Sequence, residues 1–314
     1  QAEQLQVKAL QVARDHYGAT SEKYVYALVE RATTLPDLGR RDESNAIFDE
    51  AIAIMERVGQ QDTESYPFAL WYRGVNAYGM GSLDEALGLF ERAEAACRTY
   101  RPTDSTHGAA LQWQSNVHQL RDAFDAAEAA LRKAVALASK SERPEQAGGM
   151  TRLFLGDLAS RKGEFDAALG EYEQAAQFMR QIEAGDRNPD RAVLLANTAR
   201  VRSEAGQREA ALADVRAALD IARLHPSAEP GRSLDSRARS AELMIRLGEG
   251  DAAAAVPLAR ELSSRWPPGA NNAFFANNQM LLSEAELLGG DAPAARAAAE
   301  RAVGIHEAAD ADTL

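Results

Sequence analysis

A glycine recurs about every 42 residues along this chain, each time between two segments with helical apolar periodicity. The recurring glycines are Gly39, Gly81, Gly163, Gly206, Gly248 and Gly290. Asp122 occupies the corresponding position between Gly81 and Gly163. Helical segments that repeat in pairs at a fixed period form a solenoid, because each pair must bury its apolar face against its neighbours. The period therefore predicts a stack of helix pairs.

Small side chains recur at two further positions, counted from this turn position. Seven residues before it the chain has Ala32, Gly74, Ser115, Gly156, Ala199, Ala241 and Ser283. Five residues after it come Ala86, Ala127, Ala168, Ala211 and Ala295. Small residues let the two helices of a pair cross closely, and a glycine supplies the left-handed C-cap that ends the first helix. A bulky residue four positions later, such as Phe90 or Tyr172, fills the gap to the next pair.

This pattern resembles the tetratricopeptide repeat (TPR). That family has small residues at its eighth, twentieth and twenty-seventh positions and a bulky one at its twenty-fourth. The second repeat has Gly74, Ala86, Ala93 and Phe90 there, and the fourth has Gly156, Ala168, Ala175 and Tyr172. The longer period, and the absence of the Pro that often closes the family repeat, are similar to a subgroup found in kinesin light chains and bacterial regulatory proteins. HEAT and armadillo repeats of similar length are the alternative, and the small-residue pattern favours TPR.

We therefore expect an all-α chain, an α-α superhelix of about seven helix-turn-helix repeats that forms one TPR-like solenoid over residues 1–314. The predicted repeats are 22–62, 64–103, 105–144, 147–186, 189–228, 232–266 and 273–308. Residues 1–18 resemble the second helix of an incomplete repeat, and for this reason we expect a fragment of a longer protein. The sixth repeat is degenerate, with Pro257 inside its second helix and a break at Pro267-Pro268.

The composition of the chain limits the kinds of partner that it can bind. The net charge of −12 argues against a nucleic-acid interface, which needs a basic face. No apolar run approaches the ~18 residues that a membrane span requires, so we expect no membrane insertion. Cys97 is the single cysteine. It fits a cytoplasmic location, while a periplasmic one stays open if the parent protein has a membrane-spanning segment.

No catalytic signature is present. The sequence has neither a Walker-type phosphate loop nor a nucleophile elbow. The five histidines, at 16, 107, 118, 225 and 306, are scattered, and Cys97 has no neighbouring His or Lys. Gly248-Glu249-Gly250-Asp251 resembles a phosphate turn but lacks the following Lys-Ser or Lys-Thr, and a helix C-cap explains it. We expect no enzymatic activity, no cofactor and no metal, although the parent protein could carry an enzymatic domain.

Binding is better supported. In this repeat class the first helices of successive pairs line a concave groove. The candidate contacts with a protein or peptide partner are Trp71, Tyr72, Gln112, Asn116, Asp157, Asn197 and Arg200. Aromatic rings anchor partners, and amides pair with peptide backbone. Trp71, Trp113 and Phe154 could instead be core between repeats.

The resemblance to the TPR family also bears on which part of a peptide this groove could recognise. Asn197 has the position of the asparagine that kinesin-light-chain repeats use on peptide backbone, and only this repeat keeps it. The Lys and Asn set of a chaperone-type carboxylate clamp is missing, which argues against recognition of a peptide C-terminus.

The function expected from the sequence is a non-enzymatic scaffold that binds a protein or peptide on its concave face. The alternative is the regulatory or sensor region of a bacterial signalling protein, a Ser/Thr kinase or a winged-helix transcription regulator, whose effector domain lies outside this chain. The identity of the ligand and the oligomeric state, a homo-oligomer included, stay open.

Overall fold

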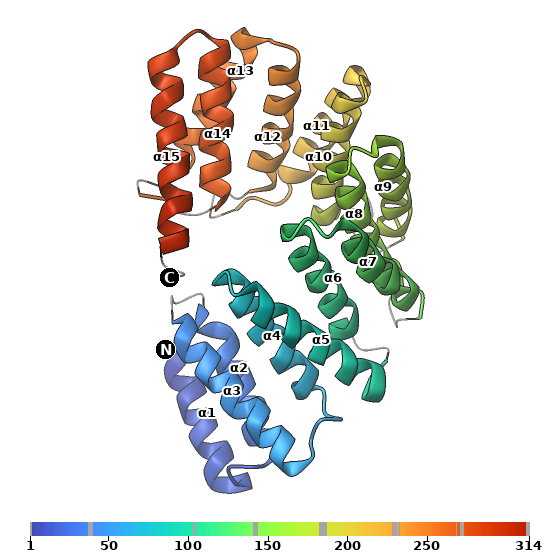
Figure 1. Cartoon of the computed structure of the whole chain (residues 1–314), viewed down its shortest axis with the longest axis vertical. Helices are drawn as coiled ribbons and strands as arrows, with labels where there is room; N and C mark the ends of the chain where they lie inside the picture. Colours follow the sequence, from blue (N-terminus) through green and yellow to red (C-terminus); the bar gives the residue numbers. More distant parts are fainter. Residues whose placement is uncertain are drawn as a thin grey trace. The chain divides into compact units, whose positions relative to one another are not determined.

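The structure is a computed structural model. It describes residues 2–36, 40–102, 105–140, 144–181, 187–227, 231, 233–267, 269–270 and 273–311. Over these ranges the chain forms fifteen helices and no strand, which confirms the all-α prediction (Figure 1). The helices fall into two compact units, Gln1–Ala147 and Gly148–Leu314, called unit 1 and unit 2 below.

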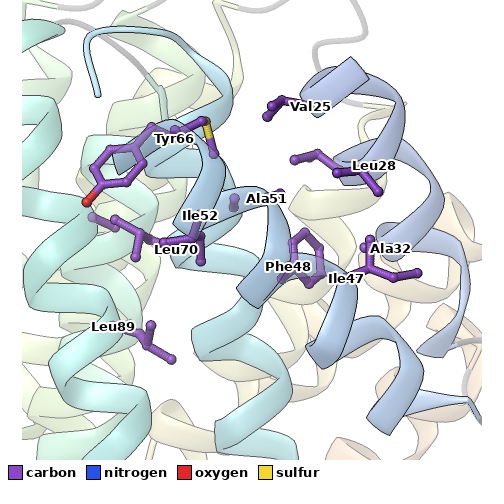
Figure 2. Packing of buried hydrophobic residues seen from close by; sticks show 14 of the residues in the cluster. Val25, Leu28, Ala32, Ile47, Phe48, Ala51, Ile52, Tyr66, Leu70 and Leu89 are labelled. Atoms are coloured by element: carbon purple, nitrogen blue, oxygen red, sulfur yellow. The ribbon is translucent and has the colours of Figure 1, made fainter. Parts of the chain in front are cut away.

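Unit 1 is built from helix pairs in chain order. Its helices are α1 (Ala2–Tyr17), α2 (Glu22–Thr34), α3 (Arg41–Val58), α4 (Ser65–Gly79), α5 (Leu83–Tyr100), α6 (Ser105–Leu120) and α7 (Phe124–Ala138). The pairs are α2 with α3, α4 with α5, and α6 with α7, and the first helices α2, α4 and α6 also contact one another in that order. Side chains of α2, α3 and α4 meet in a continuous core, among them Leu28, Phe48 and Leu70 (Figure 2).

Unit 2 repeats this arrangement. It contains most of α8 (Pro144–Arg161), then α9 (Phe165–Met179), α10 (Pro189–Glu204), α11 (Arg208–Ala222), α12 (Leu234–Gly248), α13 (Ala252–Ser264), α14 (Ala273–Leu288) and α15 (Ala292–Ala311). The first helices of the last three pairs contact one another in order, α10 with α12 and α12 with α14. These three helices form one face of unit 2, called the first-helix face below.

The turns between paired helices confirm most of the glycine pattern. Gly81, Gly163, Gly206 and Gly290 have φ of +77°, +77°, +76° and +84°. Asp122, at φ +54°, is the one non-glycine residue with positive φ among the described residues, and it takes the turn position predicted for it. A left-handed residue lets the chain leave the first helix and begin the second within two residues. Gly39 lies outside the described residues.

The sixth repeat contradicts the predicted register. Gly248 is the last residue of α12, and Gly250, at φ +69°, is the left-handed residue instead. The reason lies in the next helix: the Asp251 side chain accepts a hydrogen bond from the Ala254 amide at 3.2 Å, so α13 begins at residue 252. Counted from Gly250, the position seven residues earlier is Leu243, which is fully buried, and not Ala241.

The small-residue positions pack as predicted. Ala86, Ala127, Ala168, Ala211 and Ala295 are all buried. A methyl group added at Gly74 would lie 2.7 Å from the Phe90 ring, and one at Gly156 would overlap the Tyr172 ring. The small residue of each first helix therefore makes room for the bulky residue of its partner.

Candidate functional site

Unit 2 contains a cavity of about 430 Å³ on its first-helix face. The cavity is lined by Ala196, Asn197, Arg200, Gly231, Ser233, Ser236, Arg237, Ser240, Ala241, Met244, Trp266, Phe274, Asn277, Asn278 and Leu281. These residues come mainly from α10, α12 and α14, so three consecutive repeats contribute to one site. A concave site with convergent polar groups is where a ligand is expected to bind.

Helix caps fix where two of the helices that line the cavity begin. α10 begins at Pro189 behind an Asn188 cap, whose side chain accepts from the Asp190 amide at 2.9 Å. α12 begins behind Ser233, whose hydroxyl accepts from the Ser236 amide at 3.1 Å. Residues three or four apart share a helix face, which brings Asn197 and Arg200 together on α10.

A stripe of side chains on α12 forms another part of the cavity lining. Ser236, Ser240 and Met244 are four residues apart and all line the cavity. The Ser240 hydroxyl donates to the backbone oxygen of Ser236 at 2.8 Å. The wall from α12 therefore combines hydroxyl groups with one flexible apolar side chain.

The Trp266 indole forms an aromatic wall. It follows α13 and lies against the Phe275 ring at a centroid distance of 5.6 Å. Gly231 allows this position, because a methyl group at residue 231 would lie 2.6 Å from the indole. The close approach of backbone to ring gives the cavity a flat apolar surface beside its polar groups.

Positive charge dominates the lining. Among the residues that the structure describes, the charged side chains that line the cavity are those of Arg200 and Arg237, and none of them is a carboxylate. Over the part of the chain that the structure describes, neither guanidinium has a carboxylate within the 4.0 Å of an ion pair.

Asp157 of α8 is connected to the cavity through Asn197. Its Oδ1 accepts a hydrogen bond from the Tyr172 hydroxyl at 2.6 Å and another from the Asn197 amide at 2.8 Å. Burial raises the pKa of Asp157 above its usual value, while these hydrogen bonds and the charges of Arg200 and Arg237 act in the opposite direction. Burial beside this carboxylate also raises the pKa of Tyr172 well above its ordinary value. The hydroxyl therefore stays protonated and holds the Asp157 carboxylate in place.

Asn278 carries the most informative single atom of the site. The residue is 7% exposed, and its Oδ1 accepts no hydrogen bond from any protein group that the structure describes. A buried acceptor without a donor costs about 1–3 kcal/mol. Asn278 lines the cavity, but this oxygen is itself closed off from solvent, so a bound molecule reaches it only if the side chain turns toward the cavity.

The structure brings together three of the seven predicted contacts. Asn197 and Arg200 line the cavity, and Asp157 is hydrogen-bonded to Asn197. Trp71, Tyr72, Gln112 and Asn116 belong to unit 1 and are all half-buried.

The three aromatic residues that could be core between repeats do contact the cores of their units, and so does the groove candidate Tyr72. Trp71 packs on the unit 1 core with its indole nitrogen buried, and Tyr72 stacks on Phe48 at 5.6 Å. Trp113 stacks on Phe90 at 5.8 Å. Phe154 packs on the core formed by α8, α9 and α10.

The sequence reasoning missed the contribution of the sixth repeat. Among the lining residues it did not single out are Ser233, Ser236, Arg237, Ser240 and Trp266 of this repeat, and also Asn278 of the seventh repeat. Pro257 and the Pro pair at 267–268 made this repeat look degenerate, yet its first helix α12 is regular. The four-residue spacing of Ser236, Ser240 and Met244 was a signal that could have identified this wall.

Two further features concern other kinds of site. Over the described ranges, no helix combines the length and the apolar character that crossing a membrane requires. In the same part of the chain, no three His, Cys, Asp or Glu side chains gather in a way that would hold a metal ion.

Comparisons with known proteins agree on the fold. No protein-family model matches the sequence, and no curated protein matches it. Among solved structures, the chain is similar to the apo quorum sensor NprR from B. thuringiensis, with TM-score 0.70, 10% identity, and 97% of this chain and 82% of that chain covered. It is also similar to the Rap conjugation gene regulator of plasmid pLS20 in complex with the Phr* peptide, with TM-score 0.66, 14% identity, and 100% and 87% covered.

A third similar structure is that of a protein from Podosopora anserina described as a kinesin light chain, whose TPR-like repeats are nearly identical to one another. Its TM-score is 0.52 at 18% identity, and 65% of this chain and 97% of that chain are covered. The fold of this chain is therefore TPR-like, as the small-residue pattern predicted.

Proposed function

We propose that this chain is a scaffold that binds an extended peptide on the first-helix face of unit 2. Three asparagines, Asn197, Asn277 and Asn278, line one cavity there. The three carboxamides on one cavity are the observation that carries the proposal, since an amide side chain can pair with both the N–H and the C=O of a peptide backbone. The similar Rap regulator was solved with the Phr* peptide bound, which supports a peptide as the occupant.

For unit 1 we propose a separate contact surface for a protein or peptide partner, formed by Trp71, Tyr72, Gln112 and Asn116. Each is half-buried on α4 or α6, so part of its surface is available to a partner. Replacing Trp71 with Ala tests this assignment. Weaker peptide binding at unchanged stability supports a contact, whereas lower stability at unchanged affinity assigns Trp71 to the core.

The test of the cavity begins with affinity selection from random pentapeptides on the immobilised chain, followed by affinity measurements on a selected peptide. Ser240→Trp places a bulky ring in the cavity, whereas Arg216→Trp places the same ring on the exposed surface of α11. We expect the first variant to weaken binding at least about tenfold and the second to bind like wild type. Selection of no peptide, or equal affinities for both variants, contradicts the proposal.

The proposal includes no catalysis, no cofactor and no nucleic-acid contact. A screen for esterase, phosphatase, peptidase and ATPase turnover on the purified chain tests the first point. Turnover that a single point substitution in this chain abolishes would show an enzyme.

A second candidate function is peptide sensing, because two of the similar structures are a quorum sensor and a conjugation gene regulator. A sensor must change conformation or rigidity when its ligand binds, since only a difference between states can be passed to another domain. Small-angle scattering of the chain with and without a selected peptide separates the two functions. A change in radius of gyration supports the sensor, and an unchanged profile together with unchanged amide exchange outside the site supports a passive scaffold.

A further inference from the structure

The charge of the cavity contrasts with that of the chain. The protein has a net charge of −12, yet the charged side chains that line the cavity, within the described part of the chain, are the two guanidinium groups of Arg200 and Arg237. An acidic protein repels anions at long range, so an anion would have to be bound by local contacts.

The neighbouring carboxylate of Asp157 does not occupy the hydrogen-bond donors of this pair of arginines. Asp157 is within electrostatic range of both guanidinium groups. Its Oδ1 already accepts hydrogen bonds from Tyr172 and Asn197, and Asp157 does not line the cavity. Within the described residues, Arg200 and Arg237 form no ion pair that would occupy their donors, and a guanidinium binds a planar carboxylate with two parallel hydrogen bonds.

Resting on the proposed function, we propose that the peptide segment in this cavity carries a carboxylate, which Arg200 and Arg237 bind while the asparagine amides of the cavity pair with the backbone of the same segment. The carboxylate belongs either to an Asp or Glu side chain or to the C-terminus of the peptide. Trp266 and Met244 supply an apolar surface for the remaining atoms of the segment. A Lys or Arg at this point of the peptide would face two like charges and is excluded.

The experiment uses four pools of N-acetylated pentapeptides with random flanking residues that exclude Asp, Glu and Cys. The first pool has a central Glu and a C-terminal amide, and the second has a central Gln and an amide. The third has a central Gln and a free C-terminal carboxylate, and the fourth has a central phosphoserine and an amide. Enrichment on the immobilised full chain, relative to blank resin, is measured by mass spectrometry.

We expect the Glu pool or the free-carboxylate pool to be enriched at least about tenfold over the uncharged Gln pool, since hydrogen bonds to charged groups have about this effect. Whichever of the two is enriched identifies the source of the carboxylate. Arg237→Gln and Arg200→Gln should each abolish most of this preference. The matched control is Arg216→Gln, which removes an exposed arginine of α11 and should leave the preference unchanged.

The remaining outcomes separate the two proposals. Equal enrichment of the uncharged pool contradicts the carboxylate while the peptide-binding function stands, and enrichment of no pool overturns both. A phosphoserine pool enriched about tenfold over both carboxylate pools also overturns the carboxylate. A preference that survives both arginine substitutions shows that the carboxylate binds elsewhere. If Arg200→Gln lowers the melting temperature, a loss of preference in that variant is ambiguous. Arg237→Gln then still tests the proposal, because Arg237 is exposed.

Discussion

At the scale of single residues, packing and site chemistry meet at Gly156. This residue leaves room for the Tyr172 ring, and the Tyr172 hydroxyl in turn donates to Asp157. Asp157 is also bound by Asn197, which lines the cavity. A repeat position that the sequence identifies only as small therefore supports, three contacts away, the orientation of Asn197, a proposed binding residue.

The first prediction concerns this glycine. Gly156→Ala should lower the free energy of unfolding by about 1–3 kcal/mol, because the added methyl group overlaps the Tyr172 ring. Gly170→Ala is the matched control, since Gly170 is a helical glycine of α9 with no atom within 4 Å of an added methyl group. The control should stabilise by about 0.5–1 kcal/mol through helix propensity. Denaturant unfolding measures both, and stabilisation by both substitutions would refute the packing assignment.

The second prediction concerns Asp157. Burial raises its pKa in the folded state above the ordinary 3.8, so the native state holds this proton more tightly than the unfolded state does. The stability of wild type relative to Asp157→Asn should therefore be highest below about pH 3.8 and fall as pH rises through the raised pKa. Arg200, Arg237 and Tyr172 face this group, and burial beside the carboxylate keeps the Tyr172 hydroxyl protonated throughout this range.

Denaturant unfolding of both proteins from about pH 3.5 to pH 8 measures this difference. Asn does not titrate, so other groups cancel when the two curves are subtracted. A difference that grows with rising pH would mean that attraction to the arginines outweighs burial, contrary to our interpretation.

At the scale of helices and turns, the predictable features are those with strict local causes. A left-handed residue must end the first helix of a pair, and Gly or Asp marks that position at Gly81, Asp122 and Gly163. The prediction failed in the sixth repeat, because two glycines two residues apart both fit the pattern. The Asp251 cap decides between them in favour of Gly250. Capping geometry of this kind depends on the three-dimensional turn and not on the period.

The third prediction uses two equivalent turns. Asp122 has φ +54°, a conformation that costs most residues other than glycine about 1–2 kcal/mol. Asp122→Gly should therefore stabilise the chain by about 0.5–1 kcal/mol, after the greater freedom of glycine in the unfolded state is subtracted. Gly163→Ala should destabilise it by about 1–2 kcal/mol, although no atom lies within 4 Å of the added methyl group. Midpoints of thermal unfolding that shift in the same direction for both variants would contradict this assignment of the turns.

At the scale of the whole molecule, the sequence predicted the repeat architecture and part of the site. Asn197 and Arg200 could be placed on a first helix because α10 keeps the regular register. Arg237, Trp266 and Asn278 could not, because the cavity arises only where α10, α12 and α14 lie side by side. Periodicity assigns a residue to a helix face, whereas a cavity depends on how large and small side chains from several helices leave space between them.

The central claim is that a peptide binds on the first-helix face of unit 2. Hydrogen exchange of the chain, with and without a peptide selected on it, tests this claim most directly, because bound peptide slows exchange in the helices that it contacts. The account predicts slower exchange in α10, α12 and α14 and unchanged exchange in α11, α13 and α15. Slower exchange confined to α11, α13 and α15, or confined to unit 1, would contradict it.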